Sequence, residues 1–281
     1  MALFLGCPMW GLKSWAGPFF PSGTKPRDYL ATYSRRLNTV EGNTTFYALP
    51  DTSTVLRWRD ETPPGFKFCL KFPQTISHHR RLIDAGAETG AFVERLALLG
   101  DRCGPSFLQL PPTFGGKQLP TLASYLAALP KTLTLAVEPR HADFFGAAES
   151  DFEALLRAHN AARCIFDTTA LFDLPATHSA AVAEAQERKP KFAARYARTG
   201  PFAFVRFVGQ PELEANRPWI DAWARRVVDW LRAGDDVYFF FHCPDDTDAP
   251  NLARMLHAIV GASVALPELP DWGEPLQGRL F

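Results

Sequence analysis

Several features that the sequence lacks narrow the class of protein. The five cysteines are scattered, and none stands in a Cys-x-x-Cys pair, so neither a disulfide framework nor a thiolate zinc site is predicted. No apolar run approaches the roughly 18 residues of a membrane span, and the first residues carry no basic leader. We therefore expect a cytoplasmic protein with reduced thiols and no membrane partner.

The charge balance and the absence of glycine-rich motifs bear on which ligands the protein could bind. The 30 basic and 30 acidic side chains cancel, which argues against non-specific nucleic-acid binding but leaves a local basic cleft, and so direct DNA binding, open. Neither a GxGxxG fingerprint nor a P-loop occurs, so no redox dinucleotide site is indicated.

Short β-rich runs alternate with helical patterns along the whole chain, which implies parallel strands joined by right-handed crossovers. A (β/α)8 barrel takes about 250 residues. We therefore predict an α/β fold with a single TIM-barrel-like domain over residues 1–266, closed without an exposed edge strand, and a proline-rich C-terminal tail over 267–281. Strands are expected at 2–6, 37–41, 66–71, 106–110, 132–138, 163–167, 202–207 and 237–242. Helices are expected at 26–36, 51–61, 87–99, 119–129, 150–159, 179–188, 217–232 and 249–260.

Polar or ionisable residues stand where almost every predicted strand ends. In a barrel these positions converge on one end of the axis, the end at which catalytic residues lie. Burying this many charged side chains without partners would cost too much free energy. We therefore expect them to pair, bind a ligand or face a solvent-filled cleft. The candidate catalytic residues are Glu41, Lys71, Glu138, His141 and Asp167. The candidate substrate-binding residues are Trp10, Asn43, Thr45, Tyr47, Gln109, Arg140, Arg206 and His242.

These residue types permit three chemistries. Two carboxylates with a histidine could transfer protons while Lys71 or Arg206 stabilises an anionic intermediate. A divalent metal is a second option, although no compact ligand motif supports it. Its ligands would be Glu41, Glu138, Asp167 and His242. Lys71 as a Schiff-base nucleophile is a third option, and a purely structural ion-pair network is the alternative to all three.

The cationic candidates Lys71, Arg140 and Arg206 favour a small anionic or phosphorylated substrate. Hydrolase or lyase chemistry is favoured because no redox-cofactor motif is present. The competing class is a non-catalytic module whose pocket only holds a ligand.

Four segments resemble one family across residues 6 to about 251. They are 38–47 (NTVEGNTTFY), 109–112 (QLPP), 136–141 (AVEPRH) and 237–241 (VYFFF). Together they resemble the YecE-like family, domain of unknown function 72, which implies a TIM-barrel-like fold and no established reaction. The Cys-Pro-Met-Trp motif at 7–10, the Arg-Phe-Val-Gly at 206–209 and the His-Cys at 242–243 depart from the family's commoner Thr-Ser-Gly-Trp, Arg-Leu-His-Gly and asparagines. The chain therefore resembles a distinct subgroup.

The last residues offer a second function. Gln277, Leu280 and Phe281 resemble the bacterial sliding-clamp binding peptide, Gln-x-x-Leu-Phe, in which two apolar anchors enter a groove and the glutamine forms hydrogen bonds. The alternative is that Leu280 and Phe281 pack on the protein's own surface. The tail thus indicates a DNA-repair-associated module recruited to the sliding clamp, as the competitor to an enzyme.

Overall fold

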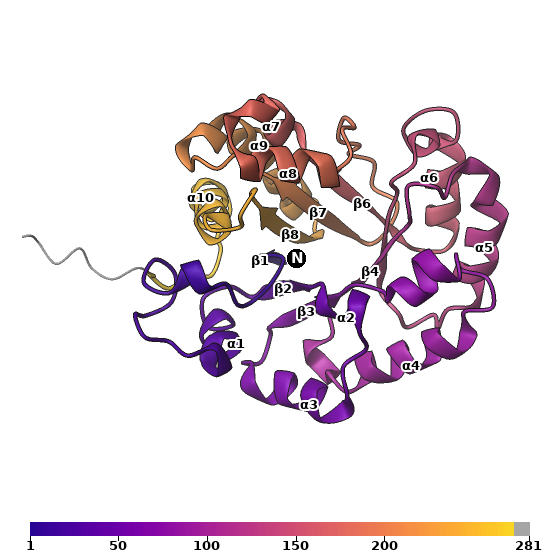
Figure 1. Ribbon diagram of the computed structural model, residues 1–281, viewed down its shortest axis with the longest axis horizontal. Helices are drawn as coiled ribbons and strands as arrows, with labels where there is room; N and C mark the ends of the chain where they lie inside the picture. The colour runs from indigo at the N-terminus through magenta and orange to yellow at the C-terminus, as the bar shows by residue number, and fades with distance from the viewer. Residues whose placement is uncertain (273–281) are drawn as a thin grey trace, which may run out of the picture.

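Short parallel strands lie at the centre of the molecule, with helices packed around them (Figure 1). The computed structural model describes residues 1–272. The strands of that part of the chain are β1 (Leu3–Gly6), β2 (Thr39–Gly42), β3 (Lys67–Leu70), β4 (Ser106–Gln109), β5 (Leu135–Glu138), β6 (Ala162–Asp167), β7 (Phe202–Val208) and β8 (Asp236–His242). All eight lie where the sequence predicts a strand.

The helices follow the predicted order, with two short additions, α2 and α7. They are α1 (Tyr29–Tyr33), α2 (Thr44–Tyr47), α3 (Thr52–Glu61), α4 (Gly86–Ala97), α5 (Leu119–Ala128), α6 (Glu149–Ala158), α7 (Thr169–Phe172), α8 (Ala180–Arg188), α9 (Arg217–Arg232) and α10 (Ala249–Gly261). Local chemistry sets several of their starts: the Asp51 carboxylate accepts a hydrogen bond from the Thr54 amide at 2.7 Å, which caps α3. No helix within residues 1–272 is long and apolar enough to cross a membrane.

The expected closed barrel is corrected by the strand pairing. The strands form two sheets, one with the order β1-β8-β7-β6-β5-β4 and one with β2 beside β3. Between β3 and β4 only isolated bridges form, at Phe68–Cys103 and Lys71–Phe107. The fold is therefore a mixed α/β fold with a mostly parallel, open sheet.

At the junction of β1 and β2, side chains take up several backbone groups, and one backbone hydrogen bond joins the Glu41 amide to the Cys7 carbonyl at 3.0 Å. The Asn38 amide donates to the Leu3 carbonyl at 2.8 Å and accepts from the Leu5 amide at 2.7 Å. The Tyr33 hydroxyl accepts from the Cys7 amide at 2.8 Å. These side chains occupy Leu3, Leu5 and Cys7 backbone groups that a regular ladder between the two segments would use.

The strands separate two apolar clusters. The inner cluster lies between the strands and contains Cys69, Phe107, Ala136, Ala162, Cys164, Phe202, Phe204, Tyr238 and Phe240. The outer cluster lies between the strands and the helices, and on β5 it receives Leu135 and Val137 while Ala136 faces inward. The alternation of the strands therefore decides which side chains meet at the centre.

The predicted tail begins against α10. The Trp272 indole donates to the Asn251 side chain at 3.2 Å, and the guanidinium of Arg254 lies 3.8 Å from the centre of its ring. The domain boundary at residue 266 stays a prediction. Gln277, Leu280 and Phe281 lie outside the described residues.

Candidate functional site

A cluster of charged side chains lies at the carboxyl end of the strands, directly above the inner apolar cluster. Each member stands two positions after an inward-facing residue, so the pleat turns it inward too. Glu138 comes two residues after Ala136, and Arg206 comes two residues after Phe204. Glu41 comes two residues after Thr39, whose hydroxyl lies 3.6 Å from the inward-facing Cys69 thiol. The strand-end cluster, as we call it, consists of Glu41, Lys71, Gln109, Glu138, Arg140, Arg206 and His242.

Arg206 lies at the centre of the strand-end cluster and is buried. Its Nε and one terminal nitrogen donate to the two carboxylate oxygens of Glu41, each at 2.7 Å. Its other terminal nitrogen donates to Glu138 at 2.5 Å. The pairing with Glu41 is bidentate, the strong and directional form of a charge-assisted hydrogen bond.

Further cations surround this centre. Arg140 pairs with the remaining oxygen of Glu138, and its terminal nitrogen donates to the Gln109 carbonyl oxygen at 3.3 Å. Lys71 Nζ donates to the same Gln109 oxygen at 2.9 Å. Two carboxylates therefore face three cationic side chains, and the cluster carries surplus positive charge.

His242 and Asn43 make the remaining contacts with the Glu41 carboxylate. His242 Nε2 lies 3.2 Å from one carboxylate oxygen. The Asn43 amide donates to the other oxygen at 2.6 Å and to the Pro8 carbonyl at 3.1 Å. Glu41 is thus fully engaged by protein groups.

These contacts determine the pKa values of the Glu41 and Glu138 carboxyl groups. Burial raises the pKa of Glu41, but the charges of Arg206 and His242 outweigh it and hold that pKa well below its usual range. Burial likewise opposes ionisation of Glu138, and the charges of Arg140 and Arg206 bring its pKa to about 2. A general base works best with a pKa near the operating pH, so this geometry favours a positioning role for both carboxylates.

The pKa of Lys71 is lowered as well, which for a lysine favours the uncharged form. Burial and the charge of Arg206 lower its pKa to about 8. Its ammonium lies 3.9 Å from the centre of the Phe46 ring, and its hydrogen bond to Gln109 holds it within the cluster.

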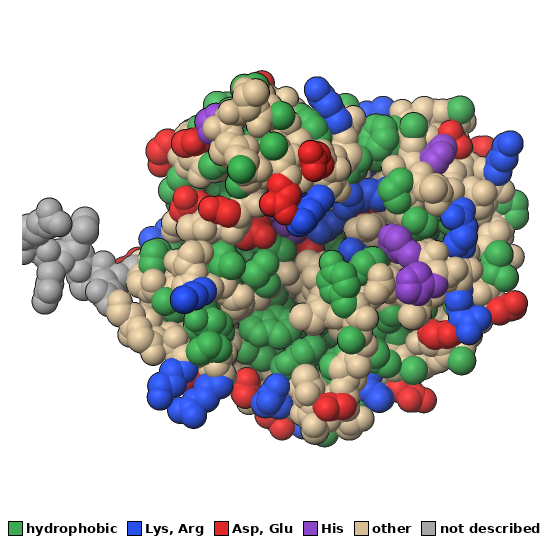
Figure 2. Space-filling model, viewed as in Figure 1, with side chains coloured by type: hydrophobic (Ala, Val, Ile, Leu, Met, Phe, Trp, Pro, Cys, Tyr) green, Lys and Arg blue, Asp and Glu red, His purple; other side chains and the backbone are tan. Residues whose placement is uncertain are grey.

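A cavity of about 730 Å³ opens beside the strand-end cluster. One wall is apolar and aromatic and consists of Pro8, Met9, Trp10, Tyr29 and Tyr47. The polar wall consists of Glu41, Asn43, Arg140, Arg188, Lys189, Arg206, His242 and Asp246. Figure 2 shows basic side chains gathered at the centre of this face, beside a stretch of hydrophobic ones.

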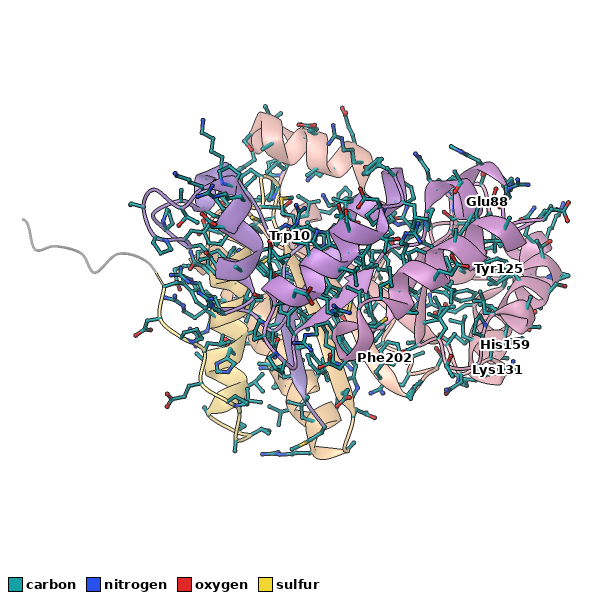
Figure 3. The ribbon with its side chains drawn as sticks, turned by 90° about the horizontal axis from the view of Figure 1, so that it is seen from below. Trp10, Glu88, Tyr125, Lys131, His159 and Phe202 are labelled. Carbon is teal, nitrogen blue, oxygen red and sulfur yellow. The ribbon has the colours of Figure 1, made fainter. Side chains whose placement is uncertain are left out.

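The structure brings together most of the predicted site residues. Glu41, Lys71, Gln109, Glu138, Arg140, Arg206 and His242 form the strand-end cluster, while Asn43, Trp10 and Tyr47 line the cavity. Trp10 packs edge-on against Trp58 at a centroid distance of 5.1 Å and lies below α8 in Figure 3. Thr45 is buried and donates to the Lys71 carbonyl at 2.7 Å, so it braces the backbone rather than facing the cavity.

Two predicted catalytic residues lie elsewhere. Asp167 points toward α9, where its carboxylate accepts from the Trp223 indole at 2.8 Å. At this strand end Phe166 faces inward, and the Arg140 guanidinium lies 4.3 Å from the centre of its ring. Successive side chains of a strand point to opposite faces, so Asp167, the next residue, faces outward. The expected position of Asp167 in the cluster is therefore wrong. His141 lies outside the cavity, and its Nδ1 accepts from the Asp143 amide at 3.1 Å.

The expected metal ligands do not assemble. Both oxygens of Glu41 and both of Glu138 accept hydrogen bonds from arginines, and Asp167 points away. Within the described part of the chain, no group of three or more His, Cys, Asp or Glu side chains is placed to hold a metal ion.

Sequence reasoning missed Arg188, Lys189 and Asp246, which line the cavity. Lys189 follows α8 in a connection without strand or helix, and Asp246 lies in the loop after β8. No local pattern marks either residue, because only the return of both loops over the strand ends places them on the cavity.

Comparisons with known proteins agree with this architecture. The sequence pattern described as protein of unknown function DUF72 matches residues 4–274. The UPF0759 protein YecE of Escherichia coli K12 is 36% identical over 256 residues, which cover 90% of this chain and 91% of that protein. YecE of E. coli O157:H7 is 35% identical over the same shares.

Solved structures show the same fold at low sequence identity. A DUF72 family protein from Thermotoga maritima MSB8 matches with a TM-score of 0.70 at 22% identity, over 92% of this chain and 99% of that one. A DUF72 family protein from Enterococcus faecalis V583 matches with a TM-score of 0.70 at 16% identity, over 97% and 100%. The whole-length family match and the YecE relatives show that this chain belongs to the DUF72 family.

Proposed function

We propose that this protein is an enzyme of the hydrolase or lyase type that binds a small carboxylated or phosphorylated substrate in the cavity at the strand ends. The observation that carries the proposal is the buried Arg206, held by two carboxylates and accompanied by Arg140 and Lys71, so that surplus positive charge adjoins a cavity of about 730 Å³. Arginine in a fixed orientation binds carboxylate and phosphate groups well.

In this proposal the polar wall and the aromatic wall of the cavity bind different parts of the substrate. Arg140 and Arg206 hold the anionic group, and Glu41 and Glu138 keep Arg206 in position. The aromatic wall with Trp10 packs against the uncharged part of the substrate, as in pockets that combine apolar walls with a few placed polar groups.

A structural network alone accounts less well for this arrangement. A network that served only stability would balance its charges, because a surplus buried charge is costly. Here three cations meet two carboxylates beside an open cavity, which favours an anionic ligand as the missing partner.

Thermal unfolding tests the proposal with inorganic phosphate, citrate, sugar phosphates and nucleoside monophosphates as ligands. A ligand at 100 times its Kd adds about 2.7 kcal/mol, a Tm shift of roughly 5–10 °C at this chain length. Arg140→Gln should reduce the shift strongly, while the control Arg217→Gln, at an exposed pair with Asp221 on α9, should keep it. A shift of equal size in Arg140→Gln would contradict the proposal.

The distinction between an enzyme and a binding module needs a second variant. Glu138→Gln removes one of the two charges that position Arg206 and keeps the side-chain shape. In an enzyme, this change should abolish turnover of the ligand found above, whereas a binding module should keep much of its affinity. Turnover equal to wild type would remove Glu138 from the mechanism.

The C-terminal residues support the competing function, recruitment to the sliding clamp. The supporting observation is the sequence Gln277-Gly-Arg-Leu-Phe281. A peptide that ends in these residues should bind the bacterial sliding clamp saturably, and a control peptide with Leu280→Ala and Phe281→Ala should not. Equal signals from both peptides would refute recruitment through this tail.

A further inference from the structure

The ionisable residues that line the cavity outside the strand-end cluster include Lys189 and Asp246. Lys189 follows α8, and Asp246 lies in the loop after β8. Figure 3 shows α8, which Lys189 follows in the chain, at the upper edge of the molecule above Trp10. Across the described residues, neither side chain forms an ion pair within 4.0 Å, and Lys189 Nζ has no hydrogen bond.

The backbone holds Asp246 firmly in place. Its φ of 57° lies in the left-handed region, which costs a non-glycine residue about 1 kcal/mol or more. The buried Trp15 donates its indole N–H to the Asp246 carbonyl at 2.9 Å, and the Asp246 carboxylate accepts from the Cys243 amide at 3.1 Å. One carboxylate oxygen is therefore anchored in a residue that lines the cavity.

The electrostatics make this pair suited to proton exchange. Burial lowers the pKa of the Lys189 amine, and the charges of Arg206 and Arg140 lower it further against the opposing charge of Asp246. Burial raises the pKa of Asp246, with the charges of His242 and Lys189 acting in the opposite direction. An uncharged amine is the nucleophile that attacks a carbonyl group, and a desolvated lysine beside other cations is the environment that supplies it.

Lys71 is less suited to the same role. Its ammonium is buried against the Phe46 ring and donates to Gln109, and it does not line the cavity. Lys189 lines the cavity and keeps its nitrogen free of protein partners among residues 1–272.

We propose that Lys189 forms an imine with an anionic aldehyde or ketone in this cavity, and that Asp246 is the proton donor of that step. The inference rests on the proposed anion-binding function and names its substrate class. Arg140 and Arg206, which line the same cavity, hold the anionic group of the substrate while its carbonyl carbon meets Lys189.

The step balances without an oxidant or reductant. The Lys189 nitrogen forms a bond to the carbonyl carbon, and one proton moves from that nitrogen to the carbonyl oxygen, which becomes a hydroxyl group. Asp246 then gives its proton to the hydroxyl, the carbon–oxygen bond breaks, and water leaves. A protonated imine remains opposite the Asp246 carboxylate, and carbon–carbon bond cleavage of the lyase type can follow from such an imine.

Reductive trapping tests the proposal with pyridoxal 5′-phosphate, an aromatic aldehyde that carries a phosphate. The protein and the probe are mixed with cyanoborohydride at neutral pH, and peptide mass spectrometry locates the adduct. We expect the adduct at Lys189, a loss of at least tenfold in trapping rate in Lys189→Arg, and an unchanged rate in the matched control Lys191→Arg, two residues further on. Asp246→Asn should slow trapping by tenfold or more, since a placed proton donor contributes about 10²–10⁴-fold.

Two outcomes would overturn the proposal: equal adduct formation at Lys189 and at exposed lysines, or an unchanged rate in Lys189→Arg. Inorganic phosphate provides a readout on the unchanged protein, because it should slow trapping by competing for the anion site. The thermal shift with inorganic phosphate separates this inference from the proposed function. If phosphate stabilises the wild type but no adduct forms at Lys189, the imine proposal fails and the anion-binding proposal stands.

Discussion

Replacement of Arg206 by methionine should destabilise the protein by an amount that depends strongly on pH. Methionine keeps much of the volume of the arginine stem but removes the hydrogen bonds that Arg206 donates to Glu41 and Glu138. Glu138 keeps its pair with Arg140, whereas Glu41 keeps only His242 and Asn43. One buried carboxylate is therefore left without a strong cationic partner.

The magnitude follows from the protonation of Glu41. A glutamic acid has an ordinary pKa of about 4.3, and one pKa unit corresponds to about 1.36 kcal/mol. Keeping Glu41 protonated in the folded variant therefore costs about 4 kcal/mol at pH 7 and about 1 kcal/mol at pH 5. The value at pH 7 agrees with the 3–5 kcal/mol that breaking a buried ion pair typically costs.

The sign of the pH dependence differs between the two proteins. In the wild type the pKa values of Glu41 and Glu138 are lowered by folding, so their stabilisation is present above about pH 4.3 and is lost as the pH falls toward the folded pKa. In Arg206→Met, burial without a paired cation raises the pKa of Glu41, so the variant loses stability as the pH rises above about 4.3. The difference in the free energy of unfolding between the wild type and Arg206→Met therefore narrows from pH 7 to pH 5.

Urea unfolding followed by circular dichroism at pH 7 and pH 5 measures this gap. The double variant Arg206→Met/Glu41→Gln should recover much of the loss at pH 7, because the unpaired charge is gone. Arg217→Met, at an exposed pair on α9, serves as the control and should cost less than about 1 kcal/mol. A gap of the same size at both pH values, or a double variant less stable than Arg206→Met, would refute the reasoning.

Three further predictions test the surroundings of the site. Asn38→Ala should lower the free energy of unfolding by about 1–3 kcal/mol, measured in urea, because it leaves β1 backbone groups without partners. Asp167→Ala should cost about 1–3 kcal/mol in the same assay, because the buried Trp223 indole loses its acceptor, and should leave the thermal shift with inorganic phosphate unchanged. Tyr47→Ala, at a residue 73% exposed on the aromatic wall, should change stability by less than about 0.5 kcal/mol and weaken the binding of ligands that carry a ring, measured by thermal shift.

Each of these predictions has an outcome that would contradict it. Asp167→Asn keeps one acceptor oxygen of the two that the Trp223 indole and the Thr169 amide use, so it should cost less stability than Asp167→Ala. A loss of phosphate binding in either Asp167 variant would return that residue to the site. Tyr47→Ala should bind inorganic phosphate as the wild type does, and a loss there would mean that the aromatic wall shapes the anion site itself. A cost below about 0.5 kcal/mol for Asn38→Ala would show that water replaces the side chain between β1 and β2.

Much of the candidate site could be predicted from the sequence. Parallel strands place their carboxyl ends on one side, so charges such as Glu41, Glu138 and Arg206 had to meet there once the strands were identified. The sequence could not show which of them pair, because Glu41 and Arg206 are 165 residues apart and meet only through the arrangement of the strands. The same limit explains why Asp167 was placed in the cluster: its strand was predicted, but the pleat that turns Phe166 inward depends on the register.

The sequence by itself determined the elements of this protein. Hydrophobic periodicity and turn residues are local properties, and they defined all eight strands and the order of the main helices. The tertiary structure alone decided whether the sheet closes, because it places the Asn38 side chain on the Leu3 carbonyl and the Leu5 amide, β1 backbone groups that a closing ladder would use. It also brought Lys189 and Asp246 to one cavity, since two loops without a local pattern acquire a common position only when the chain packs over the strand ends.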